Sequence, residues 1–150
     1  MAWVYLTIDQ AIDTHQKTVE KSGGGTVGLL EIVKLESVLD NIQNYDFYST
    51  FEEKLTHLFF CICKFHCFQD GNKRAAISLC AQMLLFNGYL FSTNNFFREA
   101  ENISYHVAAG AISKELLGEW MTAVLSGQED DEVLKLKILN AICAENTELL

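Results

Sequence analysis

The chain has 150 residues, of which 49% are hydrophobic and 21% charged, and its formal net charge at pH 7 is −9. A chain of this length and composition is expected to fold as one globular domain with its own core. The negative charge disfavours direct binding to nucleic acid or to an anionic membrane. The sequence has no signal-peptide pattern at its start and no apolar run of the roughly 18 residues that span a bilayer, so we expect a cytoplasmic protein.

The cysteines are odd in number and lie mostly in apolar surroundings: Cys61, Cys63, Cys67, Cys80 and Cys143. This pattern is a poor disulfide framework and fits a reducing compartment. A zinc site that combines Cys63 and Cys67 with a histidine is the alternative. The histidine would be His66 or His57, but no further pair of Cys or His residues completes four ligands. Packing is therefore the favoured role of these thiols.

The chain contains no proline, so nothing forces a break inside its long apolar segments. Apolar residues recur at helical spacing and few segments alternate with period two, which predicts an all-α bundle of six to seven helices. The expected helices cover residues 8–21, 33–43, 50–65, 72–86, 94–109, 113–125 and 133–143.

Two of the expected helices begin with a capping box. Thr7 is followed three residues later by Gln10, and Thr50 by Glu53. The helix that follows Thr50 is apolar nearly all round, so we expect it to occupy the centre of the bundle.

A glycine-rich segment, SGGGTVG at residues 22–28, separates the first two expected helices. Its last six residues match G-x-G-x-x-G, but a dinucleotide site also needs a preceding strand inside a βαβ unit. A charged helical segment comes first here, so we interpret residues 22–28 as a loop. The stretch 26–35 is the main exception to the helical pattern, since it could be extended.

The stretch HCFQDGNKRA, residues 66–75, separates two very apolar helices. Gly71 permits a sharp turn there. The N–H groups of Gly71, Asn72 and Lys73 would then lie at the positive end of the next helix, where phosphate oxygens bind readily. Lys73 and Arg74 add formal positive charge at the same place. The stretch therefore predicts a phosphate-binding site.

Three further residues of this stretch add chemistry to the phosphate site. Asp70 is a hard oxygen ligand suited to Mg²⁺ held against phosphates. His66 carries an imidazole, which could take a proton from an attacking hydroxyl. Phe68 would turn into the core and anchor the loop. Ordinary cap and turn roles explain each residue separately, but not the gathering of an acid, a base and two cations.

This arrangement resembles the signature of the Fic/Doc (Fido) family, a helical fold of NTP-using protein-modifying enzymes. The family's loop reads H-x-F-x-[DE]-x-N-[GK]-R. All six fixed positions match: His66, Phe68, Asp70, Asn72, Lys73 and Arg74. The chain from about residue 6 to about residue 125 further resembles the death-on-curing branch, the toxins of bacterial toxin–antitoxin pairs.

The resemblance implies a Fido-type helical bundle with a small flap, which could be a short hairpin, before the core. We expect residues 1–127 to form this domain. Residues 128–150 would supply an acidic linker and a C-terminal helix packed on the same domain.

The death-on-curing resemblance implies transfer of the γ-phosphoryl group of ATP to a Ser or Thr hydroxyl of a protein, elongation factor Tu in that branch. ATP and Mg²⁺ are the cofactors that it implies. His66 would be the general base and Asp70 would hold Mg²⁺. The loop N–H groups, with Lys73 and Arg74, would neutralise the transferring group.

Two departures from the wider family pattern bear on the reaction. Members that transfer AMP usually carry a glycine after the Asn and a second Arg three residues beyond the first. Here Lys73 replaces that glycine and Ile77 replaces that Arg. The death-on-curing branch shares the Lys, so phosphorylation is the first expectation and AMP transfer the alternative. A non-catalytic module that binds a partner or a nucleotide is the second alternative.

The resemblance also implies partners. The target segment would lie as an added strand against the flap, which is expected at Thr26, Val27, Gly28, Leu29 and Leu30. The protein target would be a translation factor, and a cognate antitoxin would restrain the enzyme. Some relatives carry an inhibitory helix with Ser/Thr-x-x-x-Glu-Gly/Asn. The tail sequence AICAEN at 141–146 lacks the Ser/Thr, so we expect a helix that caps the core instead.

Three other histidines, His15, His57 and His106, fall on expected helices. Packing or surface positions are their favoured roles. Lys64, two residues before His66, is expected to be solvated.

Overall fold

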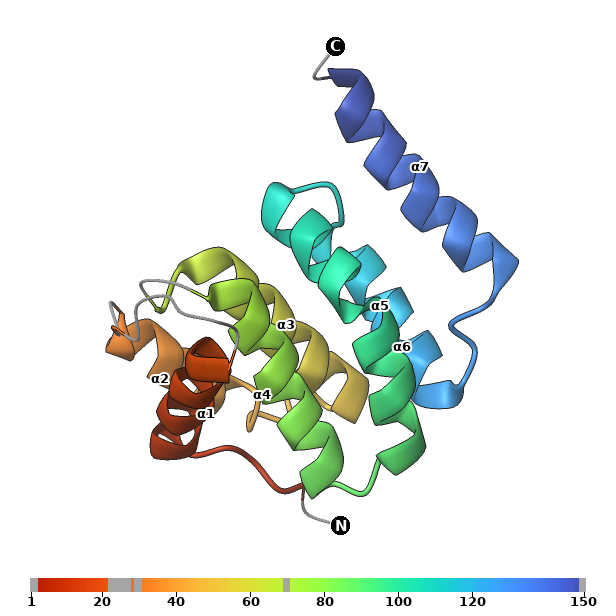
Figure 1. The fold of residues 1–150 in the computed structure, drawn as a ribbon. Coiled ribbons are helices and arrows are strands. Elements are labelled where there is room, and N and C mark those ends of the chain that lie inside the picture. Colours follow the sequence, from red (N-terminus) through yellow and green to blue (C-terminus); the bar gives the residue numbers. More distant parts are fainter. Residues whose placement is uncertain (1–2, 22–27, 29–30, 69–70, 149–150) are drawn as a thin grey trace.

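The computed structural model describes residues 3–21, 28, 31–68 and 71–148, with backbone alone for 145–148. Over these ranges the chain forms seven helices and no strand, which confirms the all-α class (Figure 1). The helices are α1 (Ile8–Lys21), α2 (Ile32–Asn41), α3 (Phe51–Phe65), α4 (Asn72–Phe86), α5 (Leu90–Ala109), α6 (Lys114–Ser126) and α7 (Glu132–Glu148). No helix within these described ranges is long and apolar enough to cross a membrane.

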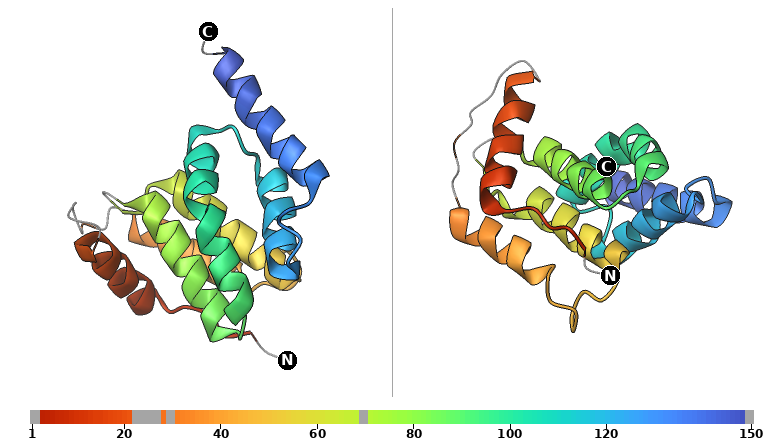
Figure 2. Two further views of the ribbon diagram at one scale, coloured as in Figure 1. Left: turned by 45° about the vertical axis from the view of Figure 1, so that its right-hand side comes forward. Right: turned by 90° about the horizontal axis from the view of Figure 1, so that it is seen from below.

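Helix α3 is the central helix, as its sequence predicts. It packs against α2, α4, α5 and α6. Leu55, Leu58, Phe59 and Ile62 on α3 are fully buried. These four residues share one face of α3, and Thr56, His57, Cys61 and Cys63 on its other sides are buried too, so neighbours cover the helix all round. Figure 2 shows α3 inside the bundle in two further views.

Both predicted capping boxes form hydrogen bonds. At α1, the Gln10 N–H donates to Thr7 Oγ1 at 3.1 Å and the Thr7 N–H donates to Gln10 Oε1 at 3.0 Å. At α3, the Glu53 N–H donates to Thr50 Oγ1 at 3.1 Å, but the Glu53 carboxylate accepts from the N–H of Ser49 at 3.2 Å. The second box therefore closes one residue earlier than its standard form.

Helix α5 begins at Leu90, four residues before the earliest predicted start. The Tyr89 carbonyl accepts both the N–H of Thr93 at 3.2 Å and its hydroxyl at 2.7 Å. This local pairing starts the helix directly after the turn at residues 87–88. Apolar periodicity alone does not reveal this first helical turn.

Helix α7 packs against α6, and a Lys137–Glu119 ion pair of 2.7 Å joins the two helices. Leu134 is buried and Ile138 packs against the core. The helix runs five residues beyond its predicted end at 143, and its C-terminal part extends away from the other helices (Figures 1 and 2). The part of α7 near the α6–α7 turn therefore covers the core, while the rest projects.

Candidate active site

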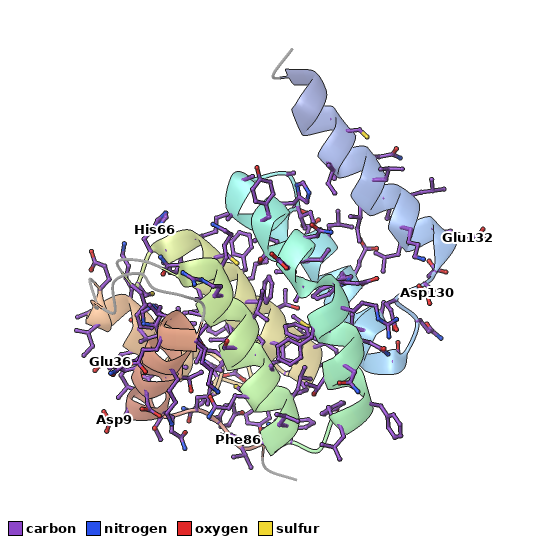
Figure 3. All side chains as sticks on the ribbon, viewed as in Figure 1. Asp9, Glu36, His66, Phe86, Asp130 and Glu132 are labelled. Carbon is purple, nitrogen blue, oxygen red and sulfur yellow. The ribbon has the colours of Figure 1, made fainter. Side chains whose placement is uncertain are left out.

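The candidate site lies where α3 ends and α4 begins. His66 ends α3 in a left-handed conformation, with φ 50° and ψ 48°. Within the described part of the chain it is the one non-glycine residue with positive φ. That conformation is uncommon for a side chain such as histidine and is concentrated at functional sites. The His66 side chain is exposed, at the end of the bundle opposite Phe86 (Figure 3).

The side chain of Asn72 closes the loop that follows His66. Asn72 Oδ1 accepts the N–H of Phe68 at 3.1 Å, and Asn72 Nδ2 donates to the Phe68 carbonyl at 3.0 Å. Both polar groups of the Phe68 backbone are thereby satisfied by a single side chain. Asn72 is also the first residue of α4, so these two bonds fix the loop relative to the helix start.

Gly71 precedes α4 with φ +73°, a conformation that favours glycine. A Cβ at Gly71 would lie 3.1 Å from Val19 Cγ2 and 3.5 Å from His15 Nε2, both on α1. Glycine is therefore required at this position by the backbone angle and by the close approach of α1.

The first turn of α4 has a positive electrostatic character. Gly71 has no side chain that could cap its N–H groups, and the turn contains no acidic residue. Lys73 is exposed and Arg74 is half-buried. The positive end of the helix dipole and two cationic side chains therefore coincide at one surface position. This combination suits the phosphates of a nucleotide.

Phe68 and Cys67 face the interior on the other side of the loop. Phe68 is 1% exposed, and its ring stacks on the His15 ring of α1 with centroids 3.8 Å apart. The Cys67 carbonyl accepts the N–H of Glu31 at 3.0 Å. The loop is thus held between α1 and the segment that precedes α2.

Several predicted site residues lie outside the described part of the chain. These are Asp70 and four of the five flap positions, Thr26, Val27, Leu29 and Leu30. Gly28, the fifth, is half-buried. Among the described residues no group of three or more His, Cys, Asp or Glu side chains could hold a metal ion. A zinc site of the kind that Cys63 and Cys67 suggested is therefore not found in that part of the chain.

Residues 5–84 match the Fic/DOC family model, and no curated protein matches the chain. The match covers more than half of the chain and contains α1, α2, α3, the candidate loop and most of α4. The chain belongs to the Fic/DOC family. Fic/DOC proteins are generally protein-modifying transferases that use a nucleoside triphosphate with a divalent metal. The fold is accordingly a Fido-type helical bundle.

Ile77 occupies the place where Fic/DOC members that transfer AMP usually carry a second Arg. Its side chain is half-buried and packs against the core. The position therefore supplies packing rather than a third positive charge near the first turn of α4.

A second polar cluster, away from the Fic/DOC loop, was not predicted. His57 and Lys114 come together there, with Lys114 Nζ 2.8 Å from His57 Nδ1. Burial, together with the positive charge of Lys114, lowers the pKa of His57 to about 4. His57 is thus a neutral acceptor for the Lys114 ammonium at physiological pH. The ring of Tyr48 lies 4.3 Å from that of His57.

Lys54 is a further residue whose place the sequence does not reveal. It is fully buried on α3, and its Nζ donates to the carbonyls of Ile42 at 2.7 Å and Tyr48 at 2.6 Å. Burial lowers the pKa of Lys54. The side chain fixes the loop between α2 and α3.

Proposed function

We propose that this protein is a protein kinase of the death-on-curing type. It would transfer the γ-phosphoryl group of ATP to a Ser or Thr hydroxyl of a protein target. The observation that carries the proposal is the candidate loop. All six signature residues are present, His66 is exposed at the end of α3, and the first turn of α4 carries Lys73 and Arg74 and no acidic residue.

In the proposed reaction, His66 accepts the proton of the target hydroxyl. The hydroxyl oxygen then bonds to the γ-phosphorus of ATP, the bond from that phosphorus to the β–γ bridging oxygen breaks, and ADP leaves. The N–H groups at the start of α4 and the side chains of Lys73 and Arg74 stabilise negative charge on the transferring group. Because Arg74 is half-buried, its guanidinium would be less mobile than the exposed Lys73 ammonium.

Magnesium is the divalent ion whose usual coordination suits this loop. In nucleotide sites Mg²⁺ takes one or two carboxylates, with substrate phosphates and water completing its shell. Asp70 would be the protein ligand, since it lies between Phe68 and Gly71 in the loop. A site of this kind needs no cluster of three protein ligands. When bound, the ion would neutralise part of the phosphate charge.

Lys73 and Ile77 favour phosphoryl transfer over the alternative, AMP transfer. The exposed Lys73 side chain stands at the position where a glycine would let an α-phosphate approach the backbone. The apolar Ile77 supplies no charge for a nucleotide bound in the AMP-transferring orientation.

The protein target would be a translation factor similar to elongation factor Tu, and a separate antitoxin would restrain the enzyme in the cytoplasm. A segment of the target would pair with the flap at residues 26–30. The hydrogen bond from the Glu31 N–H to the Cys67 carbonyl supports this arrangement. It holds the residue that directly follows the flap beside His66, where the target hydroxyl would have to lie.

Two isotopic forms of ATP test the reaction directly. The protein is incubated with Mg²⁺, purified elongation factor Tu or a bacterial lysate, and either [γ-³²P]ATP or [α-³²P]ATP. Labelling of a protein from the γ form alone is expected. Labelling from the α form alone would establish AMP transfer instead, because the γ-phosphate then leaves in pyrophosphate.

A His66→Ala variant and a Mg²⁺-free reaction are the controls. The variant is expected to label the target at least about 100-fold more slowly, and removal of Mg²⁺ is expected to abolish labelling. Absence of label from either nucleotide with the unmodified protein would favour a non-catalytic module. ATP binding measured by calorimetry then separates a nucleotide sensor from a module that binds only a protein partner.

A further inference from the structure

We infer that His15, on α1, is a positioning residue for the candidate active-site loop. Its imidazole ring holds Phe68 in place and thereby sets the position of His66 and of the first turn of α4. The inference rests on the proposed function for its effect on transfer, but the contact itself can be tested without any transfer.

The contact between the His15 and Phe68 rings is close and nearly parallel. The ring centroids lie 3.8 Å apart and the ring planes differ by 8°. This is the shortest separation among the ring pairs of the described residues, where the others range from 4.3 to 6.2 Å. Both side chains are 1% exposed. The imidazole therefore covers one face of the Phe68 ring.

A histidine is not the residue that burial alone would favour at this position. The buried face of α1 consists of Ala11, His15 and Val19. An aliphatic side chain at the middle position would bury apolar surface without burying polar ring nitrogens. A flat ring is, however, what a parallel stack on Phe68 requires. The ring of His15 thus gives Phe68 a stacking contact that an aliphatic side chain would not give.

The stack reaches the active-site groups through a short chain of contacts. The backbone of Phe68 is held by the two hydrogen bonds of Asn72, which begins α4. Gly71 lies against the same face of α1, where an added Cβ would come 3.5 Å from His15 Nε2. His66 is two residues before Phe68 in the chain. A shift of the Phe68 ring would therefore move both the base and the phosphate-binding turn.

Helix α1 has other attachments to α4, so loss of the His15 ring should leave it docked. Thr14 Oγ1 donates to Gln82 Oε1 at 2.6 Å. Thr18 Oγ1 lies 3.0 Å from Ser78 Oγ. Leu6 and Ala11 are also buried in the core. Variants of His15 can accordingly fold while the loop alone loosens.

Three variants separate the ring from the other properties of His15. His15→Phe keeps a flat ring, His15→Gln keeps a polar side chain without a ring, and His15→Ala removes both. Ile12→Ala is the matched control, because Ile12 is a partly buried residue of α1 that packs against the core.

The first measurement is backbone amide exchange by NMR. The Phe68 amide, which donates to Asn72 Oδ1, is expected to exchange about tenfold faster in His15→Ala and His15→Gln. In His15→Phe and in Ile12→Ala it is expected to stay within about threefold of the wild-type rate.

The second measurement is the transfer assay with [γ-³²P]ATP. His15→Ala and His15→Gln are expected to lower kcat by about 10- to 100-fold at a temperature well below their Tm, as misplacement by about 1 Å would. His15→Phe should restore most of the rate, and Ile12→Ala should lower Tm without lowering kcat.

The inference is overturned if His15→Phe exchanges and transfers like His15→Ala, or if His15→Gln behaves as wild type. It is also overturned if Ile12→Ala reproduces the effects of His15→Ala, since general loosening of α1 would then suffice. A wild-type protein that transfers no label refutes the proposed function instead, and the exchange measurement still decides the role of His15.

Discussion

The side-chain amide of Asn72 both donates to and accepts from the backbone of Phe68, at 3.0 and 3.1 Å. Asn72 thus acts in this loop through its amide, while its main chain begins α4. Two residues of the family signature, Asn72 and Phe68, are thus joined by two hydrogen bonds, and the phosphate-binding turn follows directly. This relationship yields a direct prediction about the asparagine.

Asn72→Ala should destabilise the protein and impair transfer together. Both backbone groups of Phe68 would lose their partner, and an unsatisfied buried group costs about 1–3 kcal/mol. Urea unfolding should show a decrease of that size, and the transfer rate should fall at least tenfold. Equal stability of wild type and Asn72→Ala would contradict the arrangement.

Gly71→Ala should destabilise the chain more than Gly88→Ala. Both glycines have positive φ, at +73° and +85°. A Cβ at Gly88 meets nothing within 4 Å, whereas one at Gly71 meets Val19 at 3.1 Å. The Gly88 variant therefore reports the backbone effect, about 1–2 kcal/mol, and the Gly71 variant adds crowding against α1.

Thermal unfolding of the two glycine variants, and of Gly71→Ala combined with Val19→Ala, provides the measurement. The double variant should lose less stability than the sum of the two single changes, because the shortened side chain makes room. Equal Tm values for Gly71→Ala and Gly88→Ala would show that α1 does not press on the loop.

The pKa of His57 predicts an acid-sensitive stability. The folded-state pKa of about 4 lies below the ordinary value of 6.5, so the unfolded chain binds a proton on this side chain more readily. The contribution of His57 is therefore full above about pH 6.5 and is lost as the pH falls toward 4. The difference between the folded and unfolded pKa values corresponds to about 2–3 kcal/mol of the free energy of unfolding.

Guanidinium unfolding between pH 7 and pH 4 measures this effect. His57→Phe should flatten the pH dependence over that window. Lys114→Met should reduce the decline, because the charge of Lys114 is the second cause of the lowered pKa. A pH profile identical in wild type and His57→Phe would refute the assignment.

The thiols should differ sharply in reactivity. Burial raises the pKa of Cys61 to about 11 and of Cys63 to about 12, while Cys143 is exposed. A thiol reagent such as DTNB at pH 7.5 should therefore modify Cys143 rapidly and the four buried cysteines only after unfolding. Cys143→Ser should remove the fast phase. A fast phase that persists in this variant would show that a buried cysteine is accessible.

The bounds of a helix were predicted correctly where the sequence marks both its start and its end. α1 was predicted to its last residue because Thr7 and Gln10 mark its start and the glycine-rich segment follows its end. α4 was predicted from 72 to 86 because Gly71 precedes it and Asn87–Gly88 follows it. The start of α5 was placed too late, since the Thr93–Tyr89 pairing is not visible in apolar spacing.

Contacts between distant segments could not be predicted in the same way. His15 lies with Ala11 and Val19 on the buried face of α1, but nothing in the spacing of that helix identifies Phe68, 53 residues later, as its partner. Lys54 is similar, because its burial depends on two carbonyls supplied by the loop between α2 and α3. The signature identifies the residues of the loop itself. The side chains that pack against the loop lie far away in the sequence, so they are known only from the folded structure.

The role of His66 is the central claim, and single-turnover transfer by wild type and His66→Ala tests it most directly. The measurement uses saturating [γ-³²P]ATP, Mg²⁺ and a protein substrate, with ATP affinity determined in parallel by calorimetry. Loss of the general base should lower the transfer rate by about 10²- to 10⁴-fold and leave ATP affinity within about threefold of wild type. A His66→Ala protein that transfers label at the wild-type rate would contradict the account.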